Sequence, residues 1–219
     1  MSKWSKLEIM SPWRRLVLIP PGPKDDVVVA AVRSDPETLR YLPFMPKSMS
    51  AAEWGAKREA HSANDEICNF HIHLAAPLGE VTTQYSTSFV GQCGIMHIDT
   101  SNHCAEIGII IPSTAHRTGI ATEAIYMTLS LAFEHPDLKL HRVQFVTAST
   151  NVQMRGWLES FGIEVEYRMR EAWTDGREGW LDSVGYSILE TEWPPLKARM
   201  EEKLSARLGP PIQYAKLWV

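Results

Sequence analysis

Apolar residues recur along this chain with the period-two alternation that is typical of strands. Between residues 67 and 74 this alternation predicts a strand whose apolar face carries Cys68, Phe70, Ile72 and Leu74. The opposite face of that strand carries Ile67, Asn69, His71 and His73. Stretches of strand character lie at residues 14–20, 67–74, 89–98, 104–111, 141–148, 164–171 and 180–189. Residues 67–111 therefore predict an antiparallel meander of three successive strands.

Helical periodicity and capping signals mark the segments between these strands. Ser50 and Glu53 form a capping box, and Asp35-Pro36 is typical of an N-cap followed by a helical turn. Gly162 stands where a helix that begins near residue 151 would end. The expected helices are residues 27–33, 51–61, 119–134, 151–161 and 194–208.

Three segments predict loops or ends. Residues 75–88 are polar and rich in turn formers, so we expect a loop there that is longer than a minimal hairpin. The residues Thr174-Asp175-Gly176-Arg177 predict a hairpin turn. Residues 209–219 form a short tail after the last helix, able to dock on this molecule or on another copy.

The stretch from residue 105 to residue 124 carries the strongest chemical signal. A strand rich in isoleucine ends at Pro112, and a basic loop that contains Gly119 leads into a helix. The first turn of a helix has unpaired N–H groups and a positive dipole end, and a glycine lets a phosphate approach the backbone. This arrangement predicts an anion site. The nucleotide P-loop ending and the three-glycine dinucleotide fingerprint are both missing.

The loop His116-Arg117-Thr118-Gly119-Ile120-Ala121 resembles the pyrophosphate loop of the GNAT superfamily of N-acetyltransferases, although His116 stands where that family has Gln or Arg. The flanking residues Ala105-Glu106-Ile107-Gly108 and Ala121-Thr122-Glu123-Ala124 resemble the RimJ/RimL-type subgroup, which modifies the N-termini of ribosomal proteins and many small amines. The alternative is an ordinary strand–loop–helix connection. The resemblance extends over about residues 14–193.

This resemblance implies an α+β fold with three layers. We expect a central mixed, mostly antiparallel sheet of about seven strands, flanked by helices and followed by a C-terminal helix. Residues 1–219 would form a single acetyltransferase domain, with a core at about 14–193, the helix at 194–208 and the tail at 209–219.

The resemblance also implies that acetyl-coenzyme A binds as co-substrate. Its pyrophosphate would lie on the loop and its pantetheine beside the preceding strand, with a second family motif that begins at Asn151 contributing contacts. The expected contacts are Ile109, Ile110, Ile111, His116, Arg117, Thr118, Gly119, Ile120, Ala121, Thr122, Asn151, Met154 and Arg155. Asn151 is equally explained as a helix N-cap, and Met154 replaces a serine common in the family.

The acceptor amine is expected near a stiff loop between the first helices. Phe44 and Met45 lie between two prolines, and the resemblance implies that they and Trp54 help to wall the acceptor pocket. The alternative role of these three side chains is packing in the core.

Glu106 is the first candidate for the general base that removes a proton from the amine. It is a carboxylate on an otherwise apolar strand, and it shares a face with Gly108 and Ile110. Its alternative role is structural, as is the expected role of Glu123. Leu158 replaces the family's usual tyrosine acid, so the acid candidates are Tyr186, His73 and Tyr126.

Composition and charge argue against several other classes of protein. The net charge is −4 without a basic block, which predicts no nucleic-acid partner, and no apolar run is long enough to span a membrane. Three widely spaced cysteines predict neither disulfides nor a zinc site, so we expect a reduced, cytoplasmic protein. His71, His73, Cys93 and His97 match no ligand motif, and no metal is expected.

Together these features predict an N-acetyltransferase. It would move the acetyl group of acetyl-coenzyme A directly, in a ternary complex, to a primary amine of a small molecule or a peptide N-terminus. The protein would act as a monomer or a homodimer. The alternative is a non-catalytic acyl-coenzyme A-binding or scaffold protein on the same fold, which Met154 and Leu158 suggest.

Overall fold

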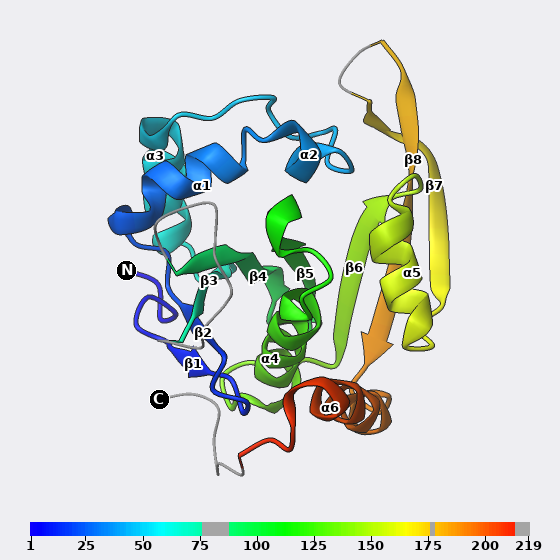
Figure 1. Ribbon diagram of the computed structural model, residues 1–219. Coiled ribbons are helices and arrows are strands. Elements are labelled where there is room, and N and C mark those ends of the chain that lie inside the picture. The colour runs from blue at the N-terminus through cyan, green and yellow to red at the C-terminus, as the bar shows by residue number, and fades with distance from the viewer. Residues whose placement is uncertain (76–87, 176–177, 213–219) are drawn as a thin grey trace.

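A computed structural model describes residues 1–75, 88–175 and 178–212 (Figure 1). Most of the expected loop at 75–88, the centre of the expected hairpin turn at 176–177, and the end of the tail at 213–219 lie outside the described residues.

Eight strands form one mixed sheet in the order β1-β2-β3-β4-β5-β6-β8-β7. All neighbouring strands are antiparallel except β5 and β6. The strands are β1 Ile9–Met10, β2 Leu16–Ile19, β3 Cys68–Leu74, β4 Phe89–Asp99, β5 Cys104–Ile110, β6 Arg142–Ala148, β7 Val165–Thr174 and β8 Trp180–Leu189. The expected fold class is confirmed. The strand beyond the expected seven is β1, which at two residues is too short to show a period.

Three helices begin at the capping residues that the sequence predicts. The capping box of Ser50 and Glu53 is formed, Asp35 caps α2, and Asn151 caps α5. Gly162, just past α5, has a φ of +74°, which favours glycine. The helices are α1 Asp26–Val32, α2 Pro36–Leu39, α3 Ala51–Ser62, α4 Ile120–Glu134, α5 Val152–Ser160 and α6 Trp193–Leu208, with short 3-10 turns η1 Pro23–Asp25 and η2 Ser113–Ala115.

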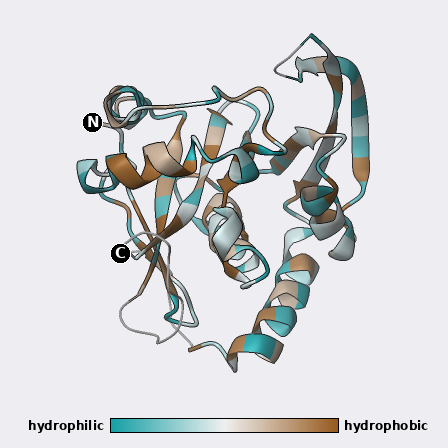
Figure 2. Ribbon diagram, turned by 45° about the horizontal axis from the view of Figure 1, so that its top comes forward, coloured by the Kyte–Doolittle hydropathy of each residue, from teal (hydrophilic) through white to brown (hydrophobic). Residues whose placement is uncertain are grey.

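Two hydrophobic cores cover the two faces of the sheet. The larger core joins one face to α4 and α6 and includes Ile107, Leu129 and Met200. The smaller core joins the other face to α1 and α3 and is built around Val29, Trp54 and Phe89, with the partly buried Ile110 packed on it. In Figure 2, α1 is largely hydrophobic, whereas α6 alternates between hydrophobic and hydrophilic residues. Strands between the two cores are therefore buried on both sides.

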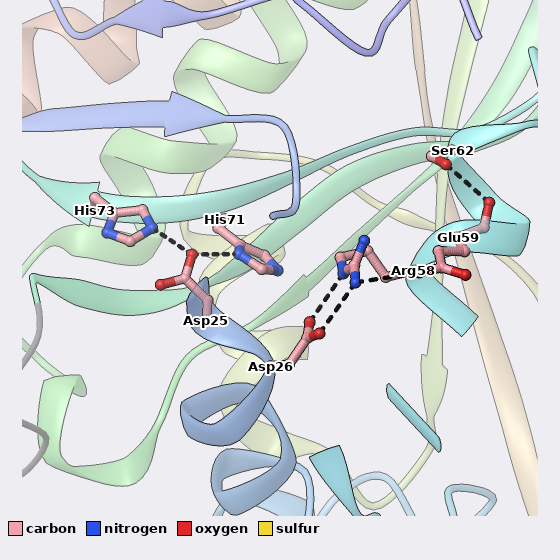
Figure 3. Close-up of polar contacts among 7 residues, drawn as sticks. All are labelled: Asp25, Asp26, Arg58, Glu59, Ser62, His71 and His73. Atoms are coloured by element: carbon pink, nitrogen blue, oxygen red, sulfur yellow. Dashed lines mark hydrogen bonds and ion pairs between the residues drawn. The ribbon is translucent and has the colours of Figure 1, made fainter. Parts of the chain in front are cut away.

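The histidine face of β3 is one such buried surface. Its histidines point toward the chain that enters α1, where Asp25 Oδ2 is 2.7 Å from His71 Nδ1 and 3.1 Å from His73 Nε2 (Figure 3). Burial acts to raise the pKa of Asp25, but the hydrogen bonds from both histidines hold it well below its usual range. Burial lowers the pKa of His71 in spite of Asp25. These contacts tie the start of α1 to the sheet.

This buried cluster predicts sensitivity to mild acid. Because the pKa of His71 is lowered by folding, the unfolded chain takes up a proton first as the pH falls below about 6.5. The free energy of unfolding should then fall by up to about 1.4 kcal/mol per pH unit for this group. Urea unfolding of His71→Gln at pH 8 to 5 should show a shallower dependence than the parent protein, since the amide does not titrate.

The exposed His141 supplies a matched control for the urea series. His141→Gln should keep the slope of the parent protein. Equal slopes for the parent and His71→Gln would contradict a role for His71 in acid sensitivity.

Candidate active site

The parallel pair β5–β6 opens partway along its length. Residues 104–106 of β5 pair with residues 142–144 of β6. The pairing stops there, although β5 continues to Ile110 and β6 to Ala148. The diverging halves no longer bond to each other, so their backbone N–H and C=O groups are available to an extended ligand between them. This divergence lies at the centre of the sheet, with the larger core below it and α1 to α3 above it (Figure 1).

The loop after β5 prepares an anion site at the start of α4. Arg117 has a φ of +60° and Gly119 a φ of +84°, and α4 begins directly afterwards. No side chain caps this helix at Gly119. The Ile120 N–H donates to Thr118 Oγ1 at 3.4 Å, and the other first-turn N–H groups and the positive dipole end lie beside the exposed Arg117, a geometry that suits phosphate.

Two arginines far from the loop in the sequence hold its backbone in place. Arg15 Nη2 donates to the Thr118 carbonyl at 3.0 Å, and Arg207 Nη1 donates to the Arg117 carbonyl at 3.1 Å. Arg15 Nε also lies 3.2 Å from the buried Glu123, which accepts a 2.5 Å hydrogen bond from Ser11. These contacts support the structural role expected for Glu123. No local pattern predicted the roles of Ser11, Arg15 or Arg207, because their partners are up to 112 residues away.

Several predicted loop side chains have partners within the protein. Thr118 donates its hydroxyl proton to the Ala115 carbonyl at 2.6 Å, and the Thr122 hydroxyl accepts a hydrogen bond from Trp157 of α5 at 3.0 Å. His116 Nε2 lies 3.0 Å from the Ile111 carbonyl. The Thr118 hydroxyl proton is therefore used within the loop, whereas the Thr122 hydroxyl keeps its proton. The available phosphate donors are the backbone N–H groups, Arg117 and the Thr122 hydroxyl.

The second motif, at the start of α5, has a structural explanation. The Asn151 side chain accepts from the Met154 N–H at 3.1 Å and donates to Thr147 Oγ1 at 2.9 Å, which supports the N-cap alternative. Met154 packs against the larger core. Arg155 donates to the Ser149 carbonyl at 2.8 Å. These three residues shape the end of β6 where it faces the divergence.

Glu106 lies at the last paired position before the strands separate. Burial raises its pKa above the usual value, and its neighbours His97 and Gln144 oppose that shift only in part. The Nδ1 atom of His97 is 3.7 Å from Glu106 Oε2. A half-buried carboxylate with a raised pKa at such a position is suited to accept a proton.

Tyr167, on β7, is a functional candidate that the sequence did not reveal. Its ring crosses β8 over Gly185, where an added Cβ would lie 2.1 Å from the ring. Gly185 pairs with Val146, so Tyr167 shares the Glu106 face of the sheet. Burial and then the charge of Glu106 raise the pKa of Tyr167, which keeps its hydroxyl protonated. That Tyr167 lies on the same face as Glu106 follows only from the register of β6, β7 and β8.

The three residues that the sequence suggests as general acid do not lie beside Glu106. Tyr186 belongs to the larger core, on the face opposite Glu106, and its hydroxyl donates to Glu159 at 3.0 Å. His73 lies two strands from β5 and past the level of Ile110, roughly 13 Å or more along the sheet from Glu106. Tyr126 donates to Glu201 from α4 at 2.7 Å. The structure brings none of these three beside Glu106.

The three predicted acceptor residues separate into different environments. Trp54 is 2% exposed in the smaller core, which supports the packing alternative for this residue. Phe44 is 45% exposed, and its ring centroid lies 4.6 Å from that of Trp173 on β7. Met45 Sδ is 3.9 Å from Arg33 Nη1. Phe44 and Trp173 therefore join the loop before α3 to β7, on the far side of the divergence.

One group of potential metal ligands occurs within the described ranges. It comprises Asp25, His71 and His73, whose ligand atoms lie within 4.8 Å of one another. The set considered from the sequence is not assembled, because Cys93 belongs to the larger core and His97 is exposed. In the described part of the chain, no helix is long and apolar enough to cross a membrane.

The family profile described as acetyltransferase (GNAT) domain matches residues 15–164. The chain therefore belongs to the GNAT acetyltransferase family. It is an acyltransferase whose general chemistry is acetyl transfer. A search of curated proteins found no significant match.

Solved structures of acetyltransferases share the fold. A GCN5-related N-acetyltransferase from Brucella melitensis is 25% identical, with a TM-score of 0.69 over 90% of this chain and 84% of that one. Mycobacterium smegmatis RimJ in complex with CoA-disulfide is 21% identical, with a TM-score of 0.71 over 92% and 96%. Spermidine N-acetyltransferase from Vibrio cholerae in complex with CoA and spermine is 18% identical, with a TM-score of 0.70 over 82% and 98%.

The loop geometry predicts a specific role for Gly119. A side chain at φ +84° is strained, and a Cβ would lie 3.4 Å from Arg207. Gly119→Ala should therefore cost about 1–2 kcal/mol of stability and weaken coenzyme A binding about tenfold, measured by calorimetry. Gly156→Ala in α5, where a Cβ meets open space, should stabilise the protein and leave binding unchanged. Unchanged affinity in Gly119→Ala would separate this loop from coenzyme binding.

Proposed function

We propose that the protein transfers the acetyl group of acetyl-coenzyme A to a primary amine of a small molecule or a peptide N-terminus. The transfer is direct, within a ternary complex. The observation that carries this proposal is the divergence of β5 from β6 beside Glu106, next to a basic loop that opens an uncapped helix. A thioester held in the divergence would have a proton acceptor at one end and an anion site at the other.

The residues present fit coenzyme A. The first turn of α4 and Arg117 would hold the pyrophosphate, since backbone N–H groups and a guanidinium suit its charge. The backbone groups of β5 that face β6 beyond Glu106 would bond to the pantetheine amides. The isoleucine side chains would cover its methylene groups. Holding the two substrates in this way is worth up to about 7–11 kcal/mol in such reactions.

The chemical step needs one proton acceptor and one donor. As the amine nitrogen bonds to the thioester carbon, its proton passes to Glu106, directly or through a water. The carbon–sulfur bond then breaks, and the thiolate takes a proton from Tyr167 or from solvent. Glu106 suits this role because burial raises its pKa, which makes its carboxylate a stronger proton acceptor than that of an exposed glutamate.

Release of free thiol distinguishes acetyl transfer from the non-catalytic alternative, which predicts no release. The parent protein, incubated with acetyl-coenzyme A and a panel of primary amines, should release free thiol. In Glu106→Gln, kcat should fall by roughly 10²–10⁴ with little change in coenzyme A affinity, because the amide cannot accept the proton. The acidic limb of the parent's pH–rate profile should have a midpoint above the usual glutamate value, because the pKa of Glu106 is raised.

Glu123→Gln is the matched control, since that buried carboxylate serves the loop. It should lower thermal stability and coenzyme affinity without moving the acidic limb. Binding without thiol release by the parent protein would favour the scaffold alternative. Near-full kcat in Glu106→Gln across the pH range would remove Glu106 as base.

The acceptor route makes a separate prediction. If the exposed Phe44 borders this route, Phe44→Ala should raise the amine KM by about 3- to 10-fold and leave the KM for acetyl-coenzyme A and the melting temperature unchanged. Trp54→Ala should instead lower the free energy of unfolding by about 3–5 kcal/mol, since it leaves a cavity in the smaller core. A large loss of stability in Phe44→Ala would return this residue to a packing role.

A further inference from the structure

Arg33 ends α1 and extends its side chain onto the sheet face that carries Glu106. Its Nε donates to the buried Gln92 Oε1 at 2.9 Å, and its guanidinium carbon lies 4.6 Å from the centre of the Trp54 ring. The sulfur of Met45 is 3.9 Å from Nη1. All of these partners are uncharged. The edge formed by the two terminal nitrogens of Arg33 makes no other hydrogen bond or ion pair with the described residues.

The lack of a carboxylate partner sets Arg33 apart. The other half-buried arginines within the described ranges each lie within 4.0 Å of a carboxylate, in the pairs Arg15–Glu123, Arg58–Asp26, Arg142–Glu166 and Arg155–Glu159. Among these residues Arg33 forms no such pair. Holding an unpaired cation away from water costs free energy, and the usual compensation is a bound counter-charge.

Two further groups from α3 add to the positive potential around Arg33. Burial lowers the pKa of Lys57, and so does the charge of Arg33. Burial, Lys57 and Arg33 together lower the pKa of His61, whose Nδ1 lies 3.0 Å from Asn69 Nδ2. Burial lowers the pKa of Arg33 to about 10, so it stays charged at neutral pH. We call Arg33, Lys57 and His61 the basic cluster.

Strand register fixes the distance from the basic cluster to the transfer site. Gln92, which binds Arg33, pairs with Ile110, and Ile110 shares its face with Gly108 and Glu106. Gly108 and Glu106 are two and four residues from Ile110, which corresponds to about 7 Å and about 13 Å along the strand. An acceptor whose amine lies beside Glu106 could therefore place a second group, one short peptide segment away, against Arg33.

We propose that the basic cluster binds a carboxylate of the acceptor, so that the preferred acceptor is a peptide N-terminus with an acidic residue shortly after it. The free edge of the Arg33 guanidinium suits a carboxylate, which it can bind through two parallel hydrogen bonds. His61 supplies a further donor when neutral, and Lys57 supplies charge at the rim. A polyamine such as spermine has no anion to offer and is repelled. This proposal rests on the proposed acetyl transfer.

The test compares two amidated tetrapeptides that differ only in Glu or Gln at the third position, with spermine as a third acceptor. The parent protein should acetylate the Glu peptide with a kcat/KM about 10- to 100-fold above that of the Gln peptide, and spermine should be poorer still. Arg33→Gln should bring the peptide ratio close to one by raising the KM for the Glu peptide. The KM for acetyl-coenzyme A should not change.

Three further variants make the result independent of folding. Arg33→Lys should restore part of the preference, and Lys57→Gln, at the rim of the basic cluster, should reduce it several-fold. Arg40→Gln removes the same charge from an exposed residue at the end of α2 and should leave the ratio unchanged. A ratio near one in the parent protein, or a preserved ratio in Arg33→Gln, would overturn the proposal while leaving acetyl transfer intact.

Peptide-binding measurements test the carboxylate subsite even if the proposed acetyl transfer fails. If no amine gives thiol release, acetyl transfer fails, and calorimetry with the N-acetylated forms of both peptides then tests the cluster alone. Tighter binding of the acidic peptide, lost in Arg33→Gln, would support the carboxylate subsite. Equal binding of the two peptides would refute it.

Discussion

The end of the pairing between β5 and β6 is the constraint on which the rest of the structure depends. Two parallel strands that stop bonding to each other at the centre of a sheet leave backbone polar groups without partners, which costs free energy. The strands therefore stay apart only where other contacts hold them in place. The two hydrophobic cores do so. One fixes β5 from below through α4, and the other fixes it from above through α1 and α3. The divergence is thus maintained by packing and remains available to a ligand.

The same constraint sorts the functional groups by face. Side chains that alternate along β5 point either into the larger core or toward α1 and α3, so Glu106, Gly108 and Ile110 share the upper face. Tyr167 reaches that face because Gly185 leaves room above β8. Arg33 reaches it from α1 through Gln92. Titratable groups from three elements, Glu106 of β5, Tyr167 of β7 and Arg33 at the end of α1, therefore face one region of the sheet.

Local signals were enough to predict most of the helices and strands, whereas the architecture of the whole sheet was implied by the family resemblance. Capping residues and periodicity placed the helices, and the seven longer strands were each recognisable from their own residues. The loop at residues 116–121 and Glu106 were likewise found from short patterns. Contacts between distant segments were not predictable in this way. The burial of His71 and His73 depends on Asp25, and that of Trp54 depends on Val29 and Phe89, so the polar face of β3 and the role of Trp54 could not be read from their neighbours in sequence.

The anchoring of the loop at residues 116–121 has a consequence for protein engineering. Its carbonyls are bound by Arg15 near one end of the chain and Arg207 near the other, and Arg15 is in turn held by Glu123. The six-residue motif is therefore not a transferable module. Grafting it onto another scaffold would move the sequence without the two guanidinium groups that set its shape, so a functional transplant must carry β2 and the last turn of α6 with it.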